Sequence, residues 1–399
     1  MQTGFEPPAP GPEALAHSER VRALVLARCV AAGAFLSFAD YMEAVLYTPG
    51  LGYYSAGAQK FGAAGDFVTA PELGAVFARC LARLAAATLG ELGGGVILEI
   101  GGGSGALAAD LLRELRDDPP DRYLLLDVSG DLRERQRQTI ARRAPELLHR
   151  VAWLDALPET PLTGILLANE VLDALPAERF RLRAGVPWQL GVQAPGGELA
   201  WAERPAPASL AAAIADLQKA LGGPLPDGYT GEIRPRQSDW LASLLGVLGR
   251  GLALCIDYGG TRRELYHPDR SDGTLAGYYR HRQLSDPFYL PGLQDLTAWV
   301  DFSAVARTAL DAGLTVAAYG TQAHTLLAAG ILEDWPADAS AADPARLREL
   351  QQIQRLLLPG EMGERFKVLA LARDFSPGFP LTVRDLQARL EATAQPAGD

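Results

Sequence analysis

The stretch "ILEIGGGSGALAADLL", Ile97–Leu112, decides the fold class of this chain. An apolar run typical of a buried strand leads into a cluster of glycines, and an amphipathic helical pattern follows. Gly101, Gly103 and Gly105 have no Cβ, so the backbone can turn sharply here and approach a ligand closely. The helix that follows directs unpaired N–H groups toward the same place. The pattern predicts a nucleotide-like ligand, and on its own it fits both a dinucleotide such as NAD and S-adenosylmethionine (SAM).

Short apolar segments, expected to be strands, alternate with helical segments after this point. They are residues 95–100, 122–128, 150–155, 164–169 and 251–259, followed by 314–320 and 365–373. Continuous apolar strands separated by helices predict a mostly parallel sheet that helices cover on both faces. The last of these segments, "RFKVLALAR", is expected at a hairpin edge of the sheet. The fold class is therefore α/β.

The remaining sequence predicts further parts around this sheet. The expected division is a disordered, proline-rich tail at 1–12, a helical N-terminal region at 13–92, a Rossmann-like core that binds the nucleotide-like ligand at 93–175, 250–260 and 300–375, and an inserted substrate lobe at 176–249 and 261–299. The lobe is expected because the gap between the fourth and fifth strands is too long for one crossover, and it contains a hairpin pattern and a helix.

Composition and charge exclude several classes of protein. The 399 residues carry a formal net charge of −11, and no long Lys/Arg block is present, so we expect no nucleic-acid partner. An acidic surface is compatible with a basic partner such as an arginine-bearing segment, although it often only favours solubility. No uninterrupted apolar run reaches the length of a membrane span. The scattered histidines show no H-x-x-x-H pair, so no metal site is expected.

The three cysteines predict the cellular compartment. Cys29, Cys80 and Cys255 lie in apolar runs without C-x-x-C spacing, which is typical of buried, reduced thiols. We therefore expect a reducing compartment. Because no targeting segment is recognised, the expected location is the cytoplasm, most simply a bacterial one.

Acids at three successive strand ends favour SAM over NAD. Glu99 lies two residues before the first glycine of the loop, where a carboxylate would repel a pyrophosphate but can hold the ammonium of a methionine moiety. Asp127 closes the second strand and can bind two ribose hydroxyls, and Asp155 closes the third and can accept from the adenine amino group. Ser129 and Ala156, which follow these two acids closely, complete the expected cofactor set.

The fourth strand ends in "NEVLDALP", which carries the expected catalytic residues Asn169, Glu170 and Asp173. Methyl transfer is an in-line displacement, so positioning the nucleophile and removing its proton provide most of the catalysis. Carboxylates can grip a guanidinium through two hydrogen bonds and orient one of its nitrogens. Glu170 and Asp173, three residues apart around a turn, could converge in this way. The alternative is that Asp173 caps the following turn and Glu170 is exposed.

Several motifs together resemble one known family. They are "FADYMEAVLYTPGLGYY", "FGAAGDFVTAPELG", "LEIGGGSGAL", "NEVLDALP", "IDYGG", "GTLAGYYRHRQLSDPFYLPGLQDLTAWVDF" and "EMGERFKVLAL", which occur in order between Phe38 and Leu371. The chain is similar to MidA-type SAM-dependent methyltransferases, which include the mitochondrial protein arginine methyltransferase of respiratory complex I assembly. The resemblance implies a class I methyltransferase fold with a mostly parallel seven-stranded sheet, a helical N-terminal part and an inserted lobe. It also implies SAM as the cofactor and protein arginine methylation as the activity.

The resemblance further implies that Asp66, Phe67 and Thr69 of the "GDFVT" loop close over SAM, and that Asn169 and Glu170 lie next to the transferable methyl. Four positions depart from the family pattern. Gly102 and Ser104 replace a proline and an arginine in the glycine loop, and Gly260 and Trp299 each replace a histidine. The first two leave SAM binding as expected, whereas the last two make the protein substrate a less direct inference.

The sequence therefore predicts a SAM-dependent methyltransferase acting on a protein arginine, with a respiratory-chain subunit as one implied substrate. Three alternatives stay open at this stage. The acceptor could be a small molecule or another nucleophile, the protein could be a SAM-binding assembly factor without catalysis, or it could be a NAD-linked oxidoreductase. The oligomeric state is also open, and a homodimer is compatible with the sequence.

Overall fold

The computed structural model describes residues 10–56, 69–333 and 344–391, so most of the predicted tail at 1–12 lies outside the described residues. The chain forms two compact units, each built from three segments. Unit 1 contains Met1–Val68, Asp173–Gln237 and Arg262–Trp299, and unit 2 contains Thr69–Leu172, Ser238–Thr261 and Val300–Asp399.

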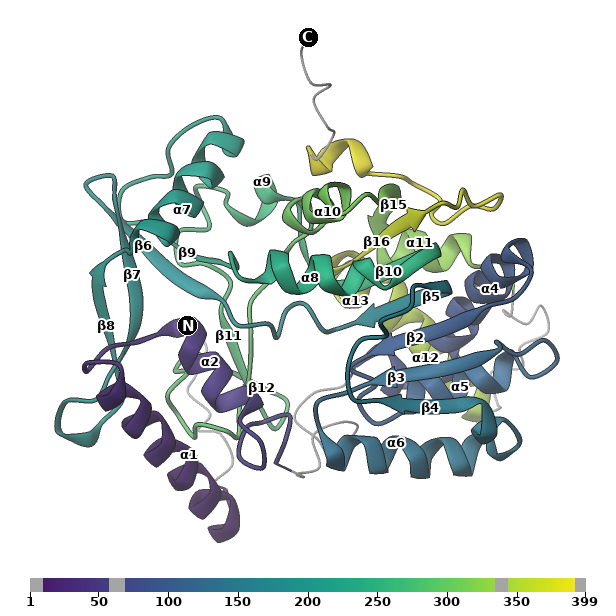
Figure 1. Ribbon diagram of the computed structural model, residues 1–399, viewed down its shortest axis with the longest axis horizontal. Coiled ribbons are helices and arrows are strands. Elements are labelled where there is room, and N and C mark those ends of the chain that lie inside the picture. The colour runs from purple at the N-terminus through teal and green to yellow at the C-terminus, as the bar shows by residue number, and fades with distance from the viewer. Residues whose placement is uncertain (1–9, 57–68, 334–343, 392–399) are drawn as a thin grey trace. The chain divides into compact units, whose positions relative to one another are not determined.

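Unit 2 is built on one large sheet (Figure 1). Its strands are β2 (Val96–Ile100), β3 (Arg122–Leu126), β4 (Val151–Leu154), β5 (Leu162–Asn169), β10 (Leu248–Gly260), β14 (Val300–Asp301), β15 (Thr315–Thr321) and β16 (Phe366–Arg373). Seven strands follow the order β15-β16-β10-β5-β2-β3-β4, and the two-residue β14 pairs with the end of β10. All pairings are parallel except those of β16. This is the class I methyltransferase sheet that the sequence predicted, with β14 as a short addition.

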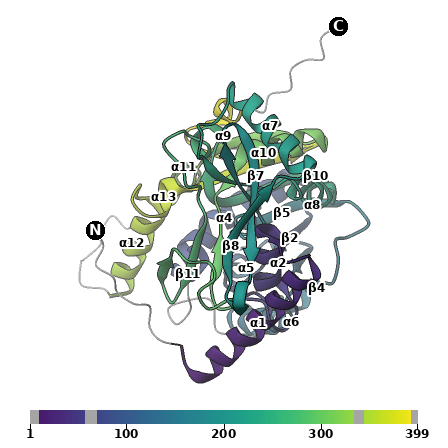
Figure 2. The ribbon, with the colours of Figure 1, turned by 90° about the vertical axis from the view of Figure 1, so that its left-hand side faces the viewer.

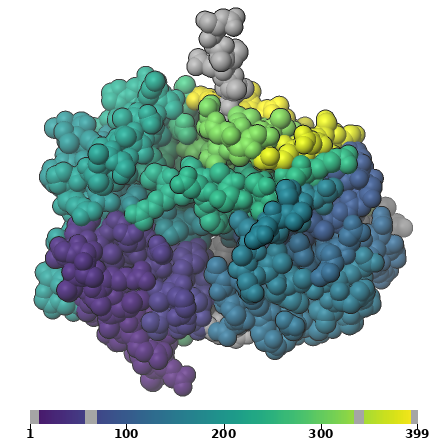
Figure 3. Space-filling model, in the orientation of Figure 1, coloured from purple at the N-terminus to yellow at the C-terminus, as the bar shows by residue number. Residues whose placement is uncertain are grey.

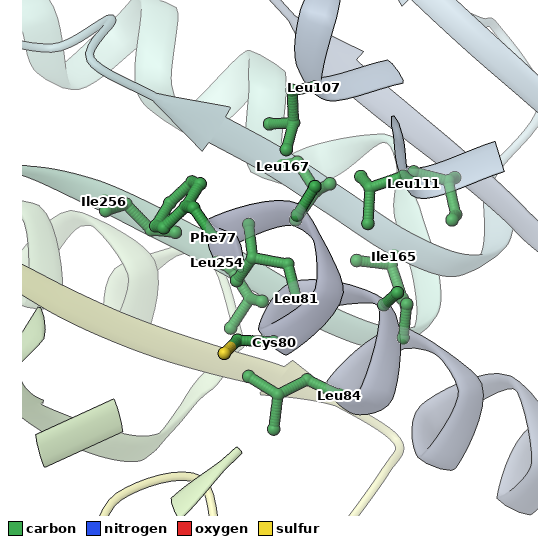
Figure 4. Close-up of a cluster of buried hydrophobic side chains, with 14 of the residues drawn as sticks. Phe77, Cys80, Leu81, Leu84, Leu107, Leu111, Ile165, Leu167, Leu254 and Ile256 are labelled. Atoms are coloured by element: carbon green, nitrogen blue, oxygen red, sulfur yellow. The ribbon is translucent and has the colours of Figure 1, made fainter. Parts of the chain in front are cut away.

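Helices cover the sheet because its strands are apolar on both faces. The helices of unit 2 are α3 (Ala70–Leu73), α4 (Ala75–Leu92), α5 (Ala106–Glu114), α6 (Gly130–Arg143), α8 (Gln237–Gly246), α10 (Phe302–Asp311), α11 (Gln322–Ala328), α12 (Pro344–Leu357) and α13 (Met362–Arg365). Figure 4 shows one core cluster, in which Phe77 and Leu81 of α4 and Leu111 of α5 meet Ile165 of β5 and Leu254 of β10. Each fully buried side chain of this size contributes roughly 1.5–3 kcal/mol to the free energy of unfolding.

The strand order reverses between β2 and β5. The chain runs outward from β2 to β3 and β4, then returns to β5 on the other side of β2. In open α/β sheets the crevice at the carboxyl ends of the strands, where the order reverses, is the usual ligand site. The glycine loop follows β2 and the expected catalytic residues follow β5, so both lie at this edge.

One prediction about the edge of the sheet was wrong. The strand expected at a hairpin edge, β16, lies between β10 and β15, and β15 forms the edge. The C-terminal segment covers that edge, where Leu386 N–H donates to Tyr319 O at 2.6 Å and Tyr319 N–H donates to Asp385 Oδ1 at 3.2 Å. Pairing of this kind removes the exposed backbone groups that make sheet edges prone to association.

Unit 1 contains smaller antiparallel sheets and helices. One sheet has the order β1 (Leu36–Ser37), β7 (Val186–Gln193), β6 (Glu178–Arg183) and β9 (Thr230–Ile233), and β8 (Ala200–Pro205) also pairs with β7. The second sheet has the order β12 (Arg282–Leu284), β11 (Ala276–Tyr279) and β13 (Asp295–Thr297). The helices are α1 (Pro12–Ala31), α2 (Phe38–Tyr47), α7 (Ala208–Leu221) and α9 (Arg262–Leu265). Ser37 caps α2 by accepting from Asp40 N–H. The predicted hairpin is β6–β7, and α7 lies beside β7 (Figures 1 and 2). Ile214 of α7 and Phe180 of β6 belong to one buried cluster.

The division into units differs from the expected boundaries most clearly for two sets of helices, and packing explains both. The N-terminal helical region is split, since Val25 of α1 and Phe38 of α2 pack with Val192 of β7, whereas α4 packs on the large sheet. Nearly all of α8, expected in the inserted lobe, belongs to unit 2. Burial rather than sequence position decides where these helices belong.

The three cysteines are all buried free thiols, as predicted. Within the described parts of the chain, no helix is both long and apolar enough to cross a bilayer. The same residues contain no group of three His, Cys, Asp or Glu side chains that could hold a metal ion.

Candidate functional site

The glycine loop turns from β2 into α5 by backbone conformations that favour glycine. Gly101, Gly103 and Gly105 have φ angles of 65°, 53° and 81°. A Cβ on Gly105 would lie 2.7 Å from the Cα of Gln136, so a side chain there would also clash with α6. The loop therefore needs these glycines for its own path, and the result is backbone that a ligand can approach.

Glu99, the penultimate residue of β2, is buried at 3% exposure. The hydroxyl of Tyr123 on β3 donates to Glu99 Oε2 at 2.7 Å. Burial raises the pKa of Glu99 from 4.5 to about 7, and this outweighs the hydrogen bond from Tyr123, which lowers the pKa. A carboxylate that is costly to ionise inside the protein is well suited to pair with a cation, such as the ammonium of a methionine moiety.

Asp127 directly follows β3 and is also buried. Its Oδ1 accepts from the N–H of Ser129 at 3.0 Å, and its Oδ2 accepts from Nε2 of Gln136 at 2.9 Å. Burial raises the pKa of Asp127, although these hydrogen bonds partly offset the effect. Ser129 itself caps α6, because its hydroxyl accepts from Leu132 N–H at 3.3 Å. The hydroxyl of Ser129 thus has a structural role, while its backbone orients Asp127.

Asp155 follows β4 and has 94% of its side chain exposed. Nη1 of Arg133 lies 2.5 Å from its Oδ1, and Nη2 of the same guanidinium donates to the carbonyls of Asp127 at 2.7 Å and Leu154 at 2.8 Å. Arg133 therefore joins the ends of β3 and β4. Val128, which follows Asp127 in the chain and is 75% exposed, offers an apolar surface at the end of β3. Ala156 is exposed in the loop that follows.

The end of β5 holds Asn169 and Glu170 in a strained turn. Glu170 has a φ of 54°, a left-handed conformation that non-glycine residues seldom adopt and that is frequent at functional sites. Its Oε1 accepts from the amide of Asn169 at 3.3 Å and from Ala70 N–H at 3.4 Å. Oδ1 of Asn169 is buried and accepts no hydrogen bond from any residue that the structure describes. These polar groups lie at the carboxyl edge, as the sequence predicted for them.

Asp257 on β10 is a site residue that the sequence analysis missed. It is fully buried, and its Oδ2 accepts from the N–H groups of Val171 at 3.2 Å and Leu172 at 2.8 Å, while its Oδ1 accepts from Tyr258 N–H at 2.9 Å. The carboxylate thus holds the turn that follows Glu170. A signal was present, since an acid inside the apolar run "LALCIDYGG" needs buried hydrogen-bond partners.

The segment after the "GDFVT" loop also reaches the site. Thr69 is the N-cap residue of α3, and Glu72 of this helix accepts a short hydrogen bond from the hydroxyl of Ser104 in the glycine loop. Ser104, one of the departures from the family pattern, therefore joins the loop to α3. Asp66 and Phe67, which were expected to close over the cofactor, lie outside the described residues.

Asp173 belongs to the other unit, because the division lies between Leu172 and Asp173. Its side chain is buried, and its charge and that of Asp295 add to the burial that raises the pKa of Tyr54. Tyr54 donates to Asp295 Oδ1 at 2.6 Å. The expected grip of Glu170 and Asp173 on one guanidinium stays a prediction.

Comparisons with known proteins show the family of this chain. A family model described as "Putative S-adenosyl-L-methionine-dependent methyltransferase" matches residues 79–320, which is more than half of the chain. A crystal structure of a Burkholderia thailandensis protein bound to S-adenosylhomocysteine is 42% identical and covers 95% of this chain and 98% of its own, with a TM-score of 0.88.

Two curated relatives are more distant. "Protein arginine methyltransferase NDUFAF7, mitochondrial" of Danio rerio is 27% identical over 84% of this chain and 83% of its own length. The Drosophila melanogaster homologue is 28% identical over 92% of this chain and 89% of its own length. These matches confirm the resemblance to MidA-type proteins and SAM as the cofactor. The chain therefore belongs to this family of S-adenosyl-L-methionine-dependent methyltransferases.

Proposed function

We propose that this methyltransferase transfers the methyl group to an arginine of a protein, and that Glu170 is its principal catalytic residue. The observation that carries the proposal is Glu170 at the carboxyl end of β5, with a left-handed backbone conformation and a hydrogen-bonded carboxylate. The names of the curated relatives, which specify protein arginine, support the same acceptor. A respiratory-chain subunit is the substrate that the family resemblance suggests.

The described residues fit SAM at the carboxyl edge of the sheet. Glu99 supplies a buried carboxylate for the ammonium, Asp127 a carboxylate for the ribose, and Val128 and Asp155 an apolar surface with an acceptor for the adenine. The positive φ angles of Gly101, Gly103 and Gly105 turn the loop backbone at this edge without side chains that would project from it. When bound, SAM supplies an electrophilic methyl group on a sulfonium, and the chain has to bring a nucleophile to it.

The residues after β5 would prepare that nucleophile. A guanidinium has a pKa above about 12 and attacks poorly while protonated and delocalised. The carboxylate of Glu170 can hold two of its N–H groups and accept the proton that the attacking nitrogen loses. Asn169, whose Oδ1 is buried without a hydrogen bond from the described residues, can accept a further N–H. We propose that Asp173 is a second carboxylate for the same guanidinium.

Incubation of a cell lysate with isotope-labelled SAM, followed by mass spectrometry of peptides and small metabolites, tests the acceptor. The expected result is label on peptide arginines with wild-type protein and its loss with Glu170→Gln, which should retain SAM affinity in calorimetry. Glu146→Gln, which alters an exposed acid of the same type, is the matched control. Label found only on metabolites would refute the arginine proposal, and transfer unaffected by Glu170→Gln would refute the role of Glu170.

We also propose that the protein works in a reducing compartment such as the bacterial cytoplasm. The three buried free thiols support this compartment, since none of them is paired in a disulfide.

A further inference from the structure

Gln136 occupies the inner face of α6, between the glycine loop and the ends of β3 and β4. Its side chain is fully buried, at 0% exposure. Nε2 donates to Gly103 O at 3.2 Å and to Asp127 Oδ2 at 2.9 Å, and Oε1 accepts from the indole Nε1 of Trp153 at 3.0 Å. One side chain thus links three elements that surround the proposed cofactor site.

The chemistry of these partners fixes which end of the carboxamide faces which neighbour. An indole N–H can only donate, so Oε1 must face Trp153. Both N–H groups of the amide must then face acceptors, namely the carbonyl of Gly103 and the carboxylate of Asp127. The two ends of a carboxamide are otherwise hard to tell apart, but here only one orientation satisfies every partner.

The backbone of Gln136 adds a second restraint on the same loop. A Cβ on Gly105 would lie 2.7 Å from the Cα of Gln136, so α6 and the glycine loop approach without an intervening side chain. Asp127 is held from both sides, by Gln136 at Oδ2 and by Ser129 N–H at Oδ1. Its carboxylate therefore has one fixed orientation, and the remaining lone pairs point in set directions.

We propose that Gln136 is the positioning residue for ribose recognition: its amide, oriented by Trp153, holds the Asp127 carboxylate and the glycine loop in the arrangement that the ribose hydroxyls require. This inference rests on the proposed contact between Asp127 and the ribose. Gln136 itself acts through Asp127 and Gly103 and does not need to touch the cofactor.

The test measures, by calorimetry, the affinities of S-adenosylhomocysteine and of its 2′-deoxyribose analogue. A hydrogen bond to a charged group changes affinity by about tenfold to a hundredfold, so wild-type protein should prefer the ribose form by at least about tenfold. Gln136→Glu keeps the size of the side chain and an acceptor for Trp153, but it places a second carboxylate against Asp127 and Gly103. The ratio of the two affinities should then fall toward one.

Gln138→Glu is the matched control, because it makes the same change on the same helix at an exposed position. The exposed outer face of α6 is part of the surface seen in Figure 3. Gln138→Glu should keep the wild-type preference. Circular dichroism checks that each variant folds. If Gln136→Glu does not fold, Gln136→Met replaces it in the test, since it removes the same hydrogen bonds without adding a charge.

The outcomes separate this inference from the proposed ribose contact. Asp127→Asn should abolish the preference, and if it does not, the ribose contact and the inference built on it are both wrong. If Asp127→Asn abolishes the preference but Gln136→Glu and Gln136→Met weaken both ligands equally, Gln136 is only structural and the inference is overturned. Loss of preference in both the Asp127 and the Gln136 variants supports it.

Discussion

Replacing Glu99 with glutamine should stabilise the protein at alkaline pH while weakening its hold on the cofactor. Burial raises the pKa of Glu99 to about 7, from an ordinary value of 4.5. Between these values the folded protein keeps a proton that the unfolded chain has released, so the free energy of unfolding falls as pH rises. Relative to a side chain that stays neutral, Glu99 lowers the free energy of unfolding by about 1 kcal/mol at pH 5 and by about 3 kcal/mol at pH 8.

Glutamine does not titrate, and its Oε1 can still accept from the Tyr123 hydroxyl. The free energy of unfolding of Glu99→Gln relative to wild type should therefore rise by about 2 kcal/mol between pH 5 and pH 8. Urea denaturation of both proteins at both pH values measures this change. Any penalty for the buried amide is the same at both pH values and cancels in the comparison.

The cofactor should respond in the opposite direction. A neutral amide cannot neutralise the ammonium of S-adenosylhomocysteine, so its affinity at pH 8 should fall by about tenfold or more in Glu99→Gln. Glu146→Gln, at an exposed position, should change neither quantity. A stability difference between Glu99→Gln and wild type that is identical at pH 5 and pH 8 would refute the reasoning, because Glu99 would then not titrate in this range.

Three further predictions follow from other buried contacts. Gly105→Ala should lower the free energy of unfolding by about 2 kcal/mol or more in urea denaturation, because residue 105 has a φ of 81° and its Cβ would lie 2.7 Å from Gln136 Cα of α6. Gly130→Ala is the control and should not lower it, because a Cβ at Gly130 would meet open space. Asp257→Asn should lower the free energy of unfolding by about 3 kcal/mol, because it weakens the hydrogen bonds that hold the turn after Glu170. It should also lower kcat with little change in S-adenosylhomocysteine affinity, and an unchanged kcat would contradict this role. Burial raises the pKa of Cys255 to about 12, so its thiol should react with a disulfide reagent at pH 8 only after unfolding, and rapid labelling of native protein would show otherwise.

The strands of the large sheet could be predicted because their sequence signal is local. Each is a short apolar run that ends in a polar or glycine residue, and the acids Glu99, Asp127 and Asp155 come at the ends of three of them. The order of the strands beyond β10 could not be read in the same way. Whether β16 or β15 forms the edge depends on pairing between segments about fifty residues apart, which no local pattern encodes.

The residues that the sequence analysis missed are those whose role depends on a distant partner. Gln136 lies in the polar run "RERQRQ", which is typical of a solvated helix face, yet it is fully buried because Asp127, Gly103 and Trp153 satisfy its amide. Asp257 was hidden in the opposite way, as a charge within an apolar strand. In both cases the side chain is explained only by backbone and polar groups that the fold brings to it.

The position of β16 has a consequence for how the protein is made. Among the described strands, β15 pairs only with β16, and β16 is the last strand to leave the ribosome. Until it emerges, β10 lacks its antiparallel neighbour and β15 has no place in the sheet. Folding of the sheet must therefore insert β16 between two segments that are synthesised before it, so the nascent chain exposes an apolar strand edge until β16 emerges.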